Sequence, residues 1–110
     1  MIRIEIENKE KPESIVVEGH AGYGVSGTDI VCASVSSILI TTINAMLRVD
    51  EKSIRYVQKE AYVKLEIITH STMIDLLMEN MISLLEELEQ DYKKYVKINK
   101  EVYLWQTLWD

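Results

Sequence analysis

The chain has 110 residues, of which 47% are hydrophobic and 27% are charged, and its formal net charge is −6. This length is enough for one domain with a buried core, and the lack of a Lys/Arg cluster argues against direct binding to nucleic acid. The acidic balance keeps a protein soluble and would also attract a basic peptide or protein.

Two strands are expected at the start of the chain. Ile2, Ile4 and Ile6 alternate with charged residues, which is typical of a half-buried strand, and Ser14–Glu18 is predicted to form the second. The first residues lack the apolar core of a signal peptide, and one cysteine cannot form an internal disulfide. We therefore expect a cytoplasmic protein.

A glycine-rich loop and a long uncharged segment follow. All four glycines lie between Gly19 and Gly27, and no charged residue occurs in the segment Ile30–Leu47. Serine, threonine and asparagine interrupt this segment too often for a membrane span, so we expect a buried helix that begins at Thr28 or Asp29 as its N-cap. The residues predicted to form its buried face are Val31, Val35, Ile38, Leu39, Ile43 and Met46.

The second half of the chain is predicted to form two strands, a helix and a last strand. The strands are expected at Ser53–Lys59, Ala61–Ile68 and Tyr95–Asn99, and the helix near Thr72, with Asp75 closing a capping box. The helix face predicted to be buried carries Ile74, Leu77, Met78, Met81, Leu85 and Leu88. The order β-β-α-β-β-α-β predicts an α+β fold, with two helices packed on a mostly antiparallel sheet as an α/β sandwich.

His20 and Cys32 flank the glycine-rich loop and are the best candidates for catalysis. Cys32 is expected in the first turn of the helix, where the helix dipole stabilises a thiolate, the nucleophilic form of cysteine. A nearby imidazole would favour the thiolate and then donate a proton to a leaving amine. From the residues alone a structural role stays open, because a lone cysteine on an apolar helix is usually a core residue.

A phosphate-binding loop and a metal site have weaker support from the sequence. The loop has no P-loop lysine and no GxGxxG pattern, which disfavours a phosphate cradle. The candidates for a metal site are His20, Asp29, Cys32 and His70, and structural zinc usually takes three or four Cys or His ligands at short spacing. We expect neither a metal nor a cofactor, and His70 is interpreted as a surface residue.

The segment from Gly19 to Ser36 resembles the signature of the ribosomal-processing cysteine protease family, Prp. That pattern consists of Gly-His-x-Gly, a loop with glycine, and Asp-x-Val-Cys-Ala-x-x-Ser. In this chain it falls on Gly19, His20, Gly22, Gly27, Asp29, Val31, Cys32, Ala33 and Ser36. The element order also resembles the family up to about residue 102, so residues 1–102 are expected to be a cysteine protease domain.

The resemblance implies a homodimer and a catalytic dyad of Cys32 and His20. It also implies an endopeptidase that removes the N-terminal extension of large-subunit ribosomal protein twenty-seven, a basic precursor that an acidic enzyme would attract. The alternative is a non-enzymatic, ribosome-associated binding module that uses the same loop. Independently, Ile40 and Leu47 lie off the main apolar stripe of the helix, which predicts a homodimer that buries them.

Several neighbours of the dyad have a supporting role in this hypothesis. Gly19 belongs to the signature, Asp29 is interpreted as a helix cap and loop anchor rather than a third catalytic residue, and Ser36 lies one turn after Cys32 on the same face. A helical serine more often bonds a backbone carbonyl than a reacting group. The loop expected to close over a bound peptide carries Gly22, Tyr23, Gly24 and Gly27.

The last residues, 103–110, form a short aromatic tail that contains both tryptophans. Leu104, Trp105, Leu108 and Trp109 would share one face of a short helix. Self-packing or a dimer contact explains this face better than a docking segment for a partner, which stays open. No membrane contact is expected.

Overall fold

The structure is a computed structural model that describes residues 1–19 and 28–102. In this part of the chain the strands and helices follow the order that the sequence predicts. They are β1 (Ile2–Asn8), β2 (Pro12–Glu18), α1 (Thr28–Val49), β3 (Ile54–Lys59), β4 (Tyr62–Ile67), α2 (Thr72–Asp91) and β5 (Val96–Val102). The aromatic tail, with its predicted helical face, lies outside the described residues.

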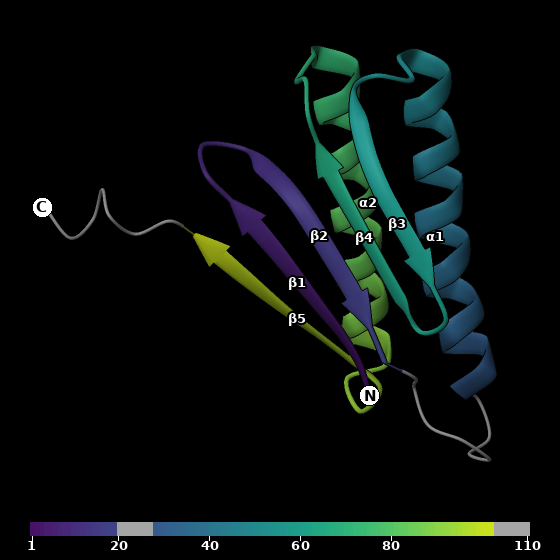
Figure 1. Cartoon of the computed structure of the whole chain (residues 1–110). Helices are drawn as coiled ribbons and strands as arrows, with labels where there is room; N and C mark the ends of the chain where they lie inside the picture. Colours follow the sequence, from purple (N-terminus) through teal and green to yellow (C-terminus); the bar gives the residue numbers. More distant parts are fainter. Residues whose placement is uncertain (20–27, 103–110) are drawn as a thin grey trace, which may run out of the picture.

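The strands form one five-stranded sheet in the order β3-β4-β2-β1-β5. The β1–β2, β2–β4 and β3–β4 pairs are antiparallel, and β1–β5 is parallel. Both helices cover the same face of this sheet, as Figure 1 shows. The predicted fold of two helices on a mostly antiparallel sheet is therefore confirmed, and β3 and β5 are its two edges.

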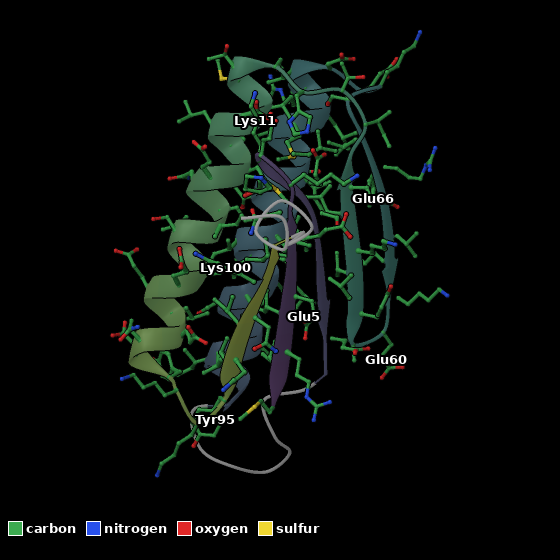
Figure 2. The ribbon with its side chains drawn as sticks, turned by 90° about the vertical axis from the view of Figure 1, so that its left-hand side faces the viewer. Glu5, Lys11, Glu60, Glu66, Tyr95 and Lys100 are labelled. Carbon is green, nitrogen blue, oxygen red and sulfur yellow. The ribbon has the colours of Figure 1, made fainter. Side chains whose placement is uncertain are left out.

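The two faces of the sheet differ as the sequence alternation requires. Ile4 and Ile6 of β1 pair with Val17 and Ile15 of β2, and all four are buried beneath the helices. The other face is polar: Glu5 lies there and accepts a hydrogen bond of 3.1 Å from the side chain of Asn99. Figure 2 shows the helices and the sheet as two layers.

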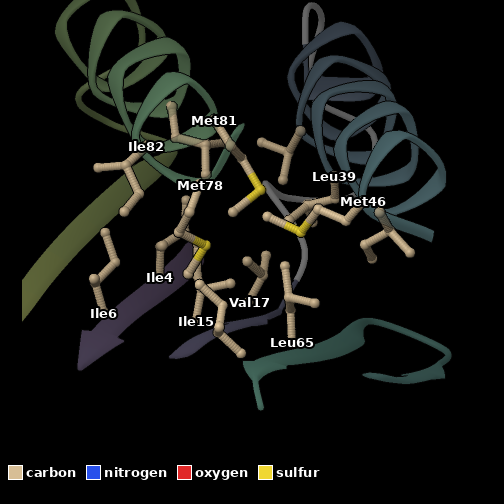
Figure 3. Packing of buried hydrophobic residues seen from close by; sticks show 14 of the residues in the cluster. Ile4, Ile6, Ile15, Val17, Leu39, Met46, Leu65, Met78, Met81 and Ile82 are labelled. Carbon is tan, nitrogen blue, oxygen red and sulfur yellow. The ribbon is translucent and has the colours of Figure 1, made fainter. Parts of the chain in front are cut away.

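The hydrophobic core fills the space between the helices and the sheet. Leu39 and Met46 come from α1 and Met78 and Met81 from α2, and each is at most 2% exposed. Figure 3 shows these side chains directed toward the sheet residues, among them Leu65 of β4. Methionine adapts its shape easily and fills the irregular gaps between two helices and a twisted sheet.

Helix α1 presents its predicted apolar face to this core. Val31, Val35, Leu39, Ile43 and Met46 are buried, and Ile38 is partly buried against them. Within the described residues, Ile30–Val49 is long and apolar enough to cross a membrane, with a mean hydropathy of 1.9. Because its inner face packs on the sheet and on α2, the helix has the position of a core helix.

The starts of both helices differ from the predicted caps. Helix α1 already includes Thr28 and Asp29, so neither residue precedes it as an N-cap. Helix α2 is capped by Ser71, whose hydroxyl accepts a hydrogen bond of 3.2 Å from the N–H of Ile74. Thr72 is therefore the first helical residue, since the serine before it reaches the free N–H groups first.

The buried face of α2 follows the prediction with one addition. Ile74, Met78, Met81 and Leu85 are buried, whereas Leu77 and Leu88 are only partly buried at the margin of the core. Ile82 was not predicted and is 7% exposed. It lies beside the predicted stripe, because a helix that packs on both a sheet and another helix buries more than one narrow face.

Candidate active site

A pocket of about 260 Å³ opens where β2 ends, between the first turns of α1 and the β3–β4 hairpin. Its apolar lining comes from the sheet and from the inner side of α1: Ile2, Val17, Val35, Leu39 and Val63. The remaining lining residues are Gly19, Cys32, Ser36, Gln58, Lys59, Ala61 and Tyr62. The pocket thus combines an apolar floor with a thiol, a hydroxyl and an amide at its margin.

Cys32 is a free cysteine that lines this pocket and is neither fully buried nor fully exposed. It is the fifth residue of α1, because the helix begins at Thr28. The sequence had placed it in the first turn, but it lies just beyond, where the helix dipole acts more weakly. A thiol open to a pocket differs from an inert core cysteine, and this position suits a nucleophile.

Ser36 lines the same pocket one helical turn after Cys32, as their spacing predicts. Its side chain is exposed. Within residues 30–49 of α1, the hydroxyls that donate to the backbone are those of Ser34, at 2.8 Å from the Ile30 carbonyl, and Thr42, at 2.8 Å from the Ile38 carbonyl. The structure therefore brings Ser36 and Cys32 together at one site.

Gly19 ends β2 in a conformation that requires glycine. Its φ is +99°, and a Cβ at this position would lie 2.5 Å from the backbone carbonyl oxygen of Met1. Its N–H donates a hydrogen bond of 2.9 Å to the carbonyl of Ala61 in the β3–β4 turn. The end of β2 is thereby attached to the hairpin that lines the pocket, and the close approach of Met1 leaves no room for a side chain at Gly19.

Ala61 also has a left-handed backbone, with φ of +56°. Alanine adopts this conformation at a cost, which glycine or asparagine would avoid. The turn contains neither of these residues, so no residue type in it indicates a left-handed position. The hydrogen bond from Gly19 holds the turn in place beside the pocket.

The other predicted site residues lie in the glycine-rich loop or directly after it. His20, Gly22, Tyr23, Gly24 and Gly27 lie outside the described residues. Asp29 is the second residue of α1, and its backbone continues the helix that carries Cys32. Gly19, Cys32 and Ser36 are thus the predicted residues that the described structure gathers at the pocket.

The residues that sequence reasoning missed come from the β3–β4 hairpin: Gln58, Lys59, Tyr62 and Val63 line the pocket opposite α1. The alternation of β4 did predict that Val63 faces inward. No local pattern indicates that this hairpin would lie beside the helix start, because that depends on the strand order β3-β4-β2.

A second polar cluster lies at the far end of the molecule, near the β1–β2 turn, where Figure 2 labels Lys11. We call it the His70 clamp, and it consists of Lys11, Glu13, His70 and Asp75. His70 Nδ1 lies 2.5 Å from Asp75 Oδ1, and its Nε2 lies 2.8 Å from Glu13 Oε2. Lys11 Nζ lies 3.0 Å from the other oxygen of Asp75. His70, interpreted from the sequence as a surface residue, is 26% exposed, and its side chain joins β2 to α2.

The charges of the clamp change the acidity of its members. Hydrogen bonds to Asp75 and Glu13 raise the pKa of His70 above 6.5, because they favour the imidazolium. Partial burial of Asp75 opposes its ionisation, but hydrogen bonds from His70 and Lys11 outweigh this, and its pKa lies below 3.8. In residues 1–19 and 28–102, no group of three or more His, Cys, Asp or Glu side chains is arranged to hold a metal ion.

A free thiol that reaches an apolar pocket from the start of a helix is a placement suited to cysteine hydrolases, whose thiolate attacks a bound carbonyl. The chain belongs to the Prp family of cysteine proteases: the family model described as "Cysteine protease Prp" matches residues 1–97. It is therefore a cysteine protease of the ribosomal-processing family. The alternative of a non-enzymatic binding module is set aside.

Relatives agree in sequence and in fold. The chain is 25% identical over 101 residues to the ribosomal processing cysteine protease Prp of Staphylococcus aureus, which covers 89% of this chain and 95% of that protein. The crystal structure of SMU.848 from Streptococcus mutans has a TM-score of 0.80 and 26% identity, covering 93% of this chain and 95% of that one.

Structures of the Staphylococcus aureus protease share the fold. One, described as a complex with a covalently linked product peptide, has a TM-score of 0.83 and 23% identity, and it covers 92% of this chain and 100% of that one. Another, with a substrate peptide, has a TM-score of 0.84 and 22% identity at the same coverage. These likenesses confirm the two-layer arrangement of helices on a mixed sheet.

Proposed function

We propose that this protease removes the N-terminal extension of a ribosomal protein precursor, large-subunit ribosomal protein twenty-seven, with Cys32 as nucleophile and His20 as acid and base. The observation that carries the proposal is the position of the free Cys32 thiol at the margin of a pocket of about 260 Å³. The relatives named ribosomal processing proteases support the substrate class.

The reaction follows from the thiol and an imidazole. The Cys32 thiolate attacks the carbonyl carbon of the scissile peptide bond, forming a C–S bond and a tetrahedral oxyanion. When the C–N bond breaks, the imidazolium of His20 gives its proton to the leaving amine, and a thioester remains. Water then gives a proton to His20 and attacks the thioester, which regenerates the Cys32 thiolate and releases the new carboxylic acid, whose proton is lost to solvent.

The pocket gives the substrate a place beside the nucleophile. Its floor, formed by residues such as Val35, Leu39 and Val63, suits an apolar side chain next to the scissile bond. The loop with Gly22, Tyr23, Gly24 and Gly27 is proposed to cover the bound peptide. Removal of bulk water by such a closure would strengthen the interactions that stabilise the oxyanion.

We also propose that the protease acts in the cytoplasm as a homodimer. Of the two residues predicted to be buried in a dimer, Ile40 is 44% exposed, whereas Leu47 is partly buried against the core and does not support a dimer surface. The exposed apolar residues of the helices, Ile30 at 61% and Leu76 at 57%, support it instead. Light scattering on the purified chain is expected to give twice the monomer mass, and a monomer mass at high concentration would contradict the dimer.

The experiment uses a synthetic peptide that spans the cleaved end of the same organism's precursor of ribosomal protein twenty-seven. Mass spectrometry of the products is expected to show one cut. Cys32→Ala is expected to abolish cleavage, and His20→Ala to lower kcat by about 100-fold or more, the range of general acid–base catalysis.

The second histidine provides a matched control. His70→Gln removes an imidazole at the far end of the molecule, and it is expected to leave kcat unchanged at a temperature where the variant is folded. Cleavage by Cys32→Ala would contradict the nucleophile, and full activity of His20→Ala would contradict the dyad. If the peptide stays uncut although the Cys32 thiol of the protein is reactive, the proposed substrate is wrong.

A further inference from the structure

The pocket at Cys32 continues along α1. A second, shallower hollow of about 30 Å³ is lined by Ser36, Leu39, Ile40, Ile43, Gln58 and Val63. Ser36, Leu39, Gln58 and Val63 also line the main pocket, so the two hollows adjoin. Together they form a groove between one flank of α1 and strand β3, which we call the α1–β3 groove.

The helix side of the groove is a single stripe. Cys32, Ser36, Ile40 and Ile43 follow one another at intervals of four, four and three residues, which places them on one flank of a helix. Ile40 is 44% exposed and so offers apolar surface to a bound chain. No charged residue occurs from Ile30 to Leu47, so this wall of the groove is uncharged.

The strand side of the groove is an open edge of the sheet. Among the described residues, strand β3 pairs with β4 on one side only, and Figure 1 shows it as the outermost strand on the side of α1. Tyr56 and Gln58 pair with the inward-facing Leu65 and Val63, so they lie on the helix face of the sheet. Tyr56 is nevertheless 44% exposed. An edge strand of six residues exposes backbone N–H and C=O groups that can pair with another strand.

We infer, on the basis of the proposed protease function, that the substrate binds in extended conformation as an additional strand on the free edge of β3. Main-chain hydrogen bonds hold the substrate, and every second side chain enters the α1–β3 groove. The groove leads directly to Cys32, so a chain paired with β3 is delivered to the thiol. The substrate segment that this site recognises carries uncharged, mainly apolar residues at alternate positions.

A substrate strand paired with β3 explains features of this strand that a permanently covered edge would not need. Strand β3 has no proline, and its edge is open although five of its six residues are exposed. Natural proteins usually block such an edge to prevent unwanted pairing. Both edges of the sheet lack a second partner among the described residues, and β3 is the edge beside the thiol, whereas β5 lies beyond β1 and β2.

Hydrogen exchange of the backbone amides tests the pairing. The Cys32→Ala variant is measured with and without the synthetic precursor peptide described above. We expect slower exchange at alternate amides within Ile54–Lys59, because only every second N–H of an edge strand points outward. The β3 amides could instead exchange slowly before peptide is added and exchange faster when the protein is diluted. That result would show that a second copy of the chain occupies the edge, and it would overturn the inference.

Peptides with a single N-methyl group provide a readout that does not depend on a protein variant. Each N-methylation that removes a pairing hydrogen bond is expected to weaken binding about fivefold, and methylation at the positions between is expected to have little effect. A period of two along the peptide supports strand addition. Cleavage of the unmodified peptide with no protection of β3 and no such period would overturn the inference and leave the proposed function intact.

Two protein variants distinguish peptide binding in the α1–β3 groove from binding to another apolar surface. Ile40→Glu is expected to raise the dissociation constant of the peptide about tenfold, because it places a charge on the uncharged helix wall of the groove. Leu84→Glu on α2, where the leucine is 39% exposed, is the matched control and is expected to bind normally. Equal affinity of both variants would contradict the groove. If wild-type protein neither binds nor cuts the peptide, the proposed function and the inference fail together.

Discussion

The two ends of the molecule hold a strand to a helix or hairpin in opposite ways. At the far end, the His70 clamp joins β2 and α2 through charged side chains that satisfy one another at 2.5 to 3.0 Å. At the pocket end, the attachment is a backbone hydrogen bond from Gly19 to Ala61, both with positive φ. The pocket end leaves its side chains free for a ligand, while the far end uses its side chains for stability.

The difference shows where each kind of interaction is useful. A backbone hydrogen bond fixes position without adding a charge, whereas each ion pair places two more charges in its surroundings. Strained backbone tends to occur at functional sites, where the surrounding structure maintains it. The following experiments alter one end at a time.

The largest effect is expected for Gly19→Val at the pocket end. The new side chain would meet the Met1 carbonyl at 2.5 Å and would have to adopt a φ of +99°. We expect a loss of about 3 kcal/mol or more in the free energy of unfolding, measured with urea. Cleavage by the folded fraction is expected to fall as well, because the end of β2 moves.

Glu18→Ala is the control for this change, since Glu18 is exposed and adjacent to Gly19. Its free energy of unfolding is expected to stay within about 0.5 kcal/mol of wild type. A Gly19→Val variant as stable and active as wild type would show that the close approach of Met1 is not needed.

At the far end, His70→Ala is expected to lower the free energy of unfolding by about 1 to 2 kcal/mol at pH 6, because it removes two charge-assisted hydrogen bonds at a partly exposed position. Cleavage per folded molecule is expected to be unchanged. Urea unfolding and peptide cleavage on the same preparation measure both quantities. A variant that loses activity while keeping its stability would place His70 in the catalytic machinery.

The clamp should also make stability depend on pH in two directions. Because the pKa of His70 is raised in the folded chain, its contribution is complete below pH 6.5 and is lost as pH rises through the folded value. Because the pKa of Asp75 is lowered, its contribution is complete above pH 3.8 and is lost as pH falls through the folded value. The clamp is therefore strongest between these values.

The measurement compares wild type with His70→Gln from pH 5 to pH 9. We expect their difference in unfolding free energy to decrease as pH rises, since only wild type loses a stabilising imidazolium. A difference that stays constant over this range would show that His70 does not act through its charge.

The smallest effect is expected for Ala61→Gly, which relieves the left-handed backbone at φ of +56°. The variant is expected to be more stable by about 0.5 to 1 kcal/mol in urea unfolding, net of the greater freedom of glycine in the unfolded chain. Ala33→Gly, at an exposed position in α1, is expected to be less stable by about 1 kcal/mol. Opposite signs for the two substitutions support strain at Ala61, and equal signs would contradict it.

The parts of the structure that could be predicted from the sequence are those that local patterns determine. The alternation of Ile2, Ile4 and Ile6 and the helical spacing of the α1 and α2 cores gave the elements, because hydrophobic periodicity reports burial directly. Cys32 was identified as a site residue because it lies in a dense motif, and Ser36 because it lies one helical turn after Cys32.

The missed features depend on residues far apart in the chain. Gln58 lies beside Ser36 at the pocket, and His70 bonds to Glu13, 57 positions earlier. No local pattern encodes such pairs, since they exist only after the strands take their order in the sheet. The capping of α2 was misjudged by one residue, because both Ser71 and Thr72 have suitable side chains.

The parallel pairing of β1 with β5 affects when the enzyme matures during its synthesis. Ile2, which lines the pocket, pairs with Val96 on the last strand to leave the ribosome. The N–H of Ile2 also bonds to the carbonyl of Tyr95 at 2.7 Å. A nascent chain without β5 therefore has an unfinished pocket wall, and β1 remains an open edge. The pocket wall at Ile2 is therefore complete only after β5 has paired with β1.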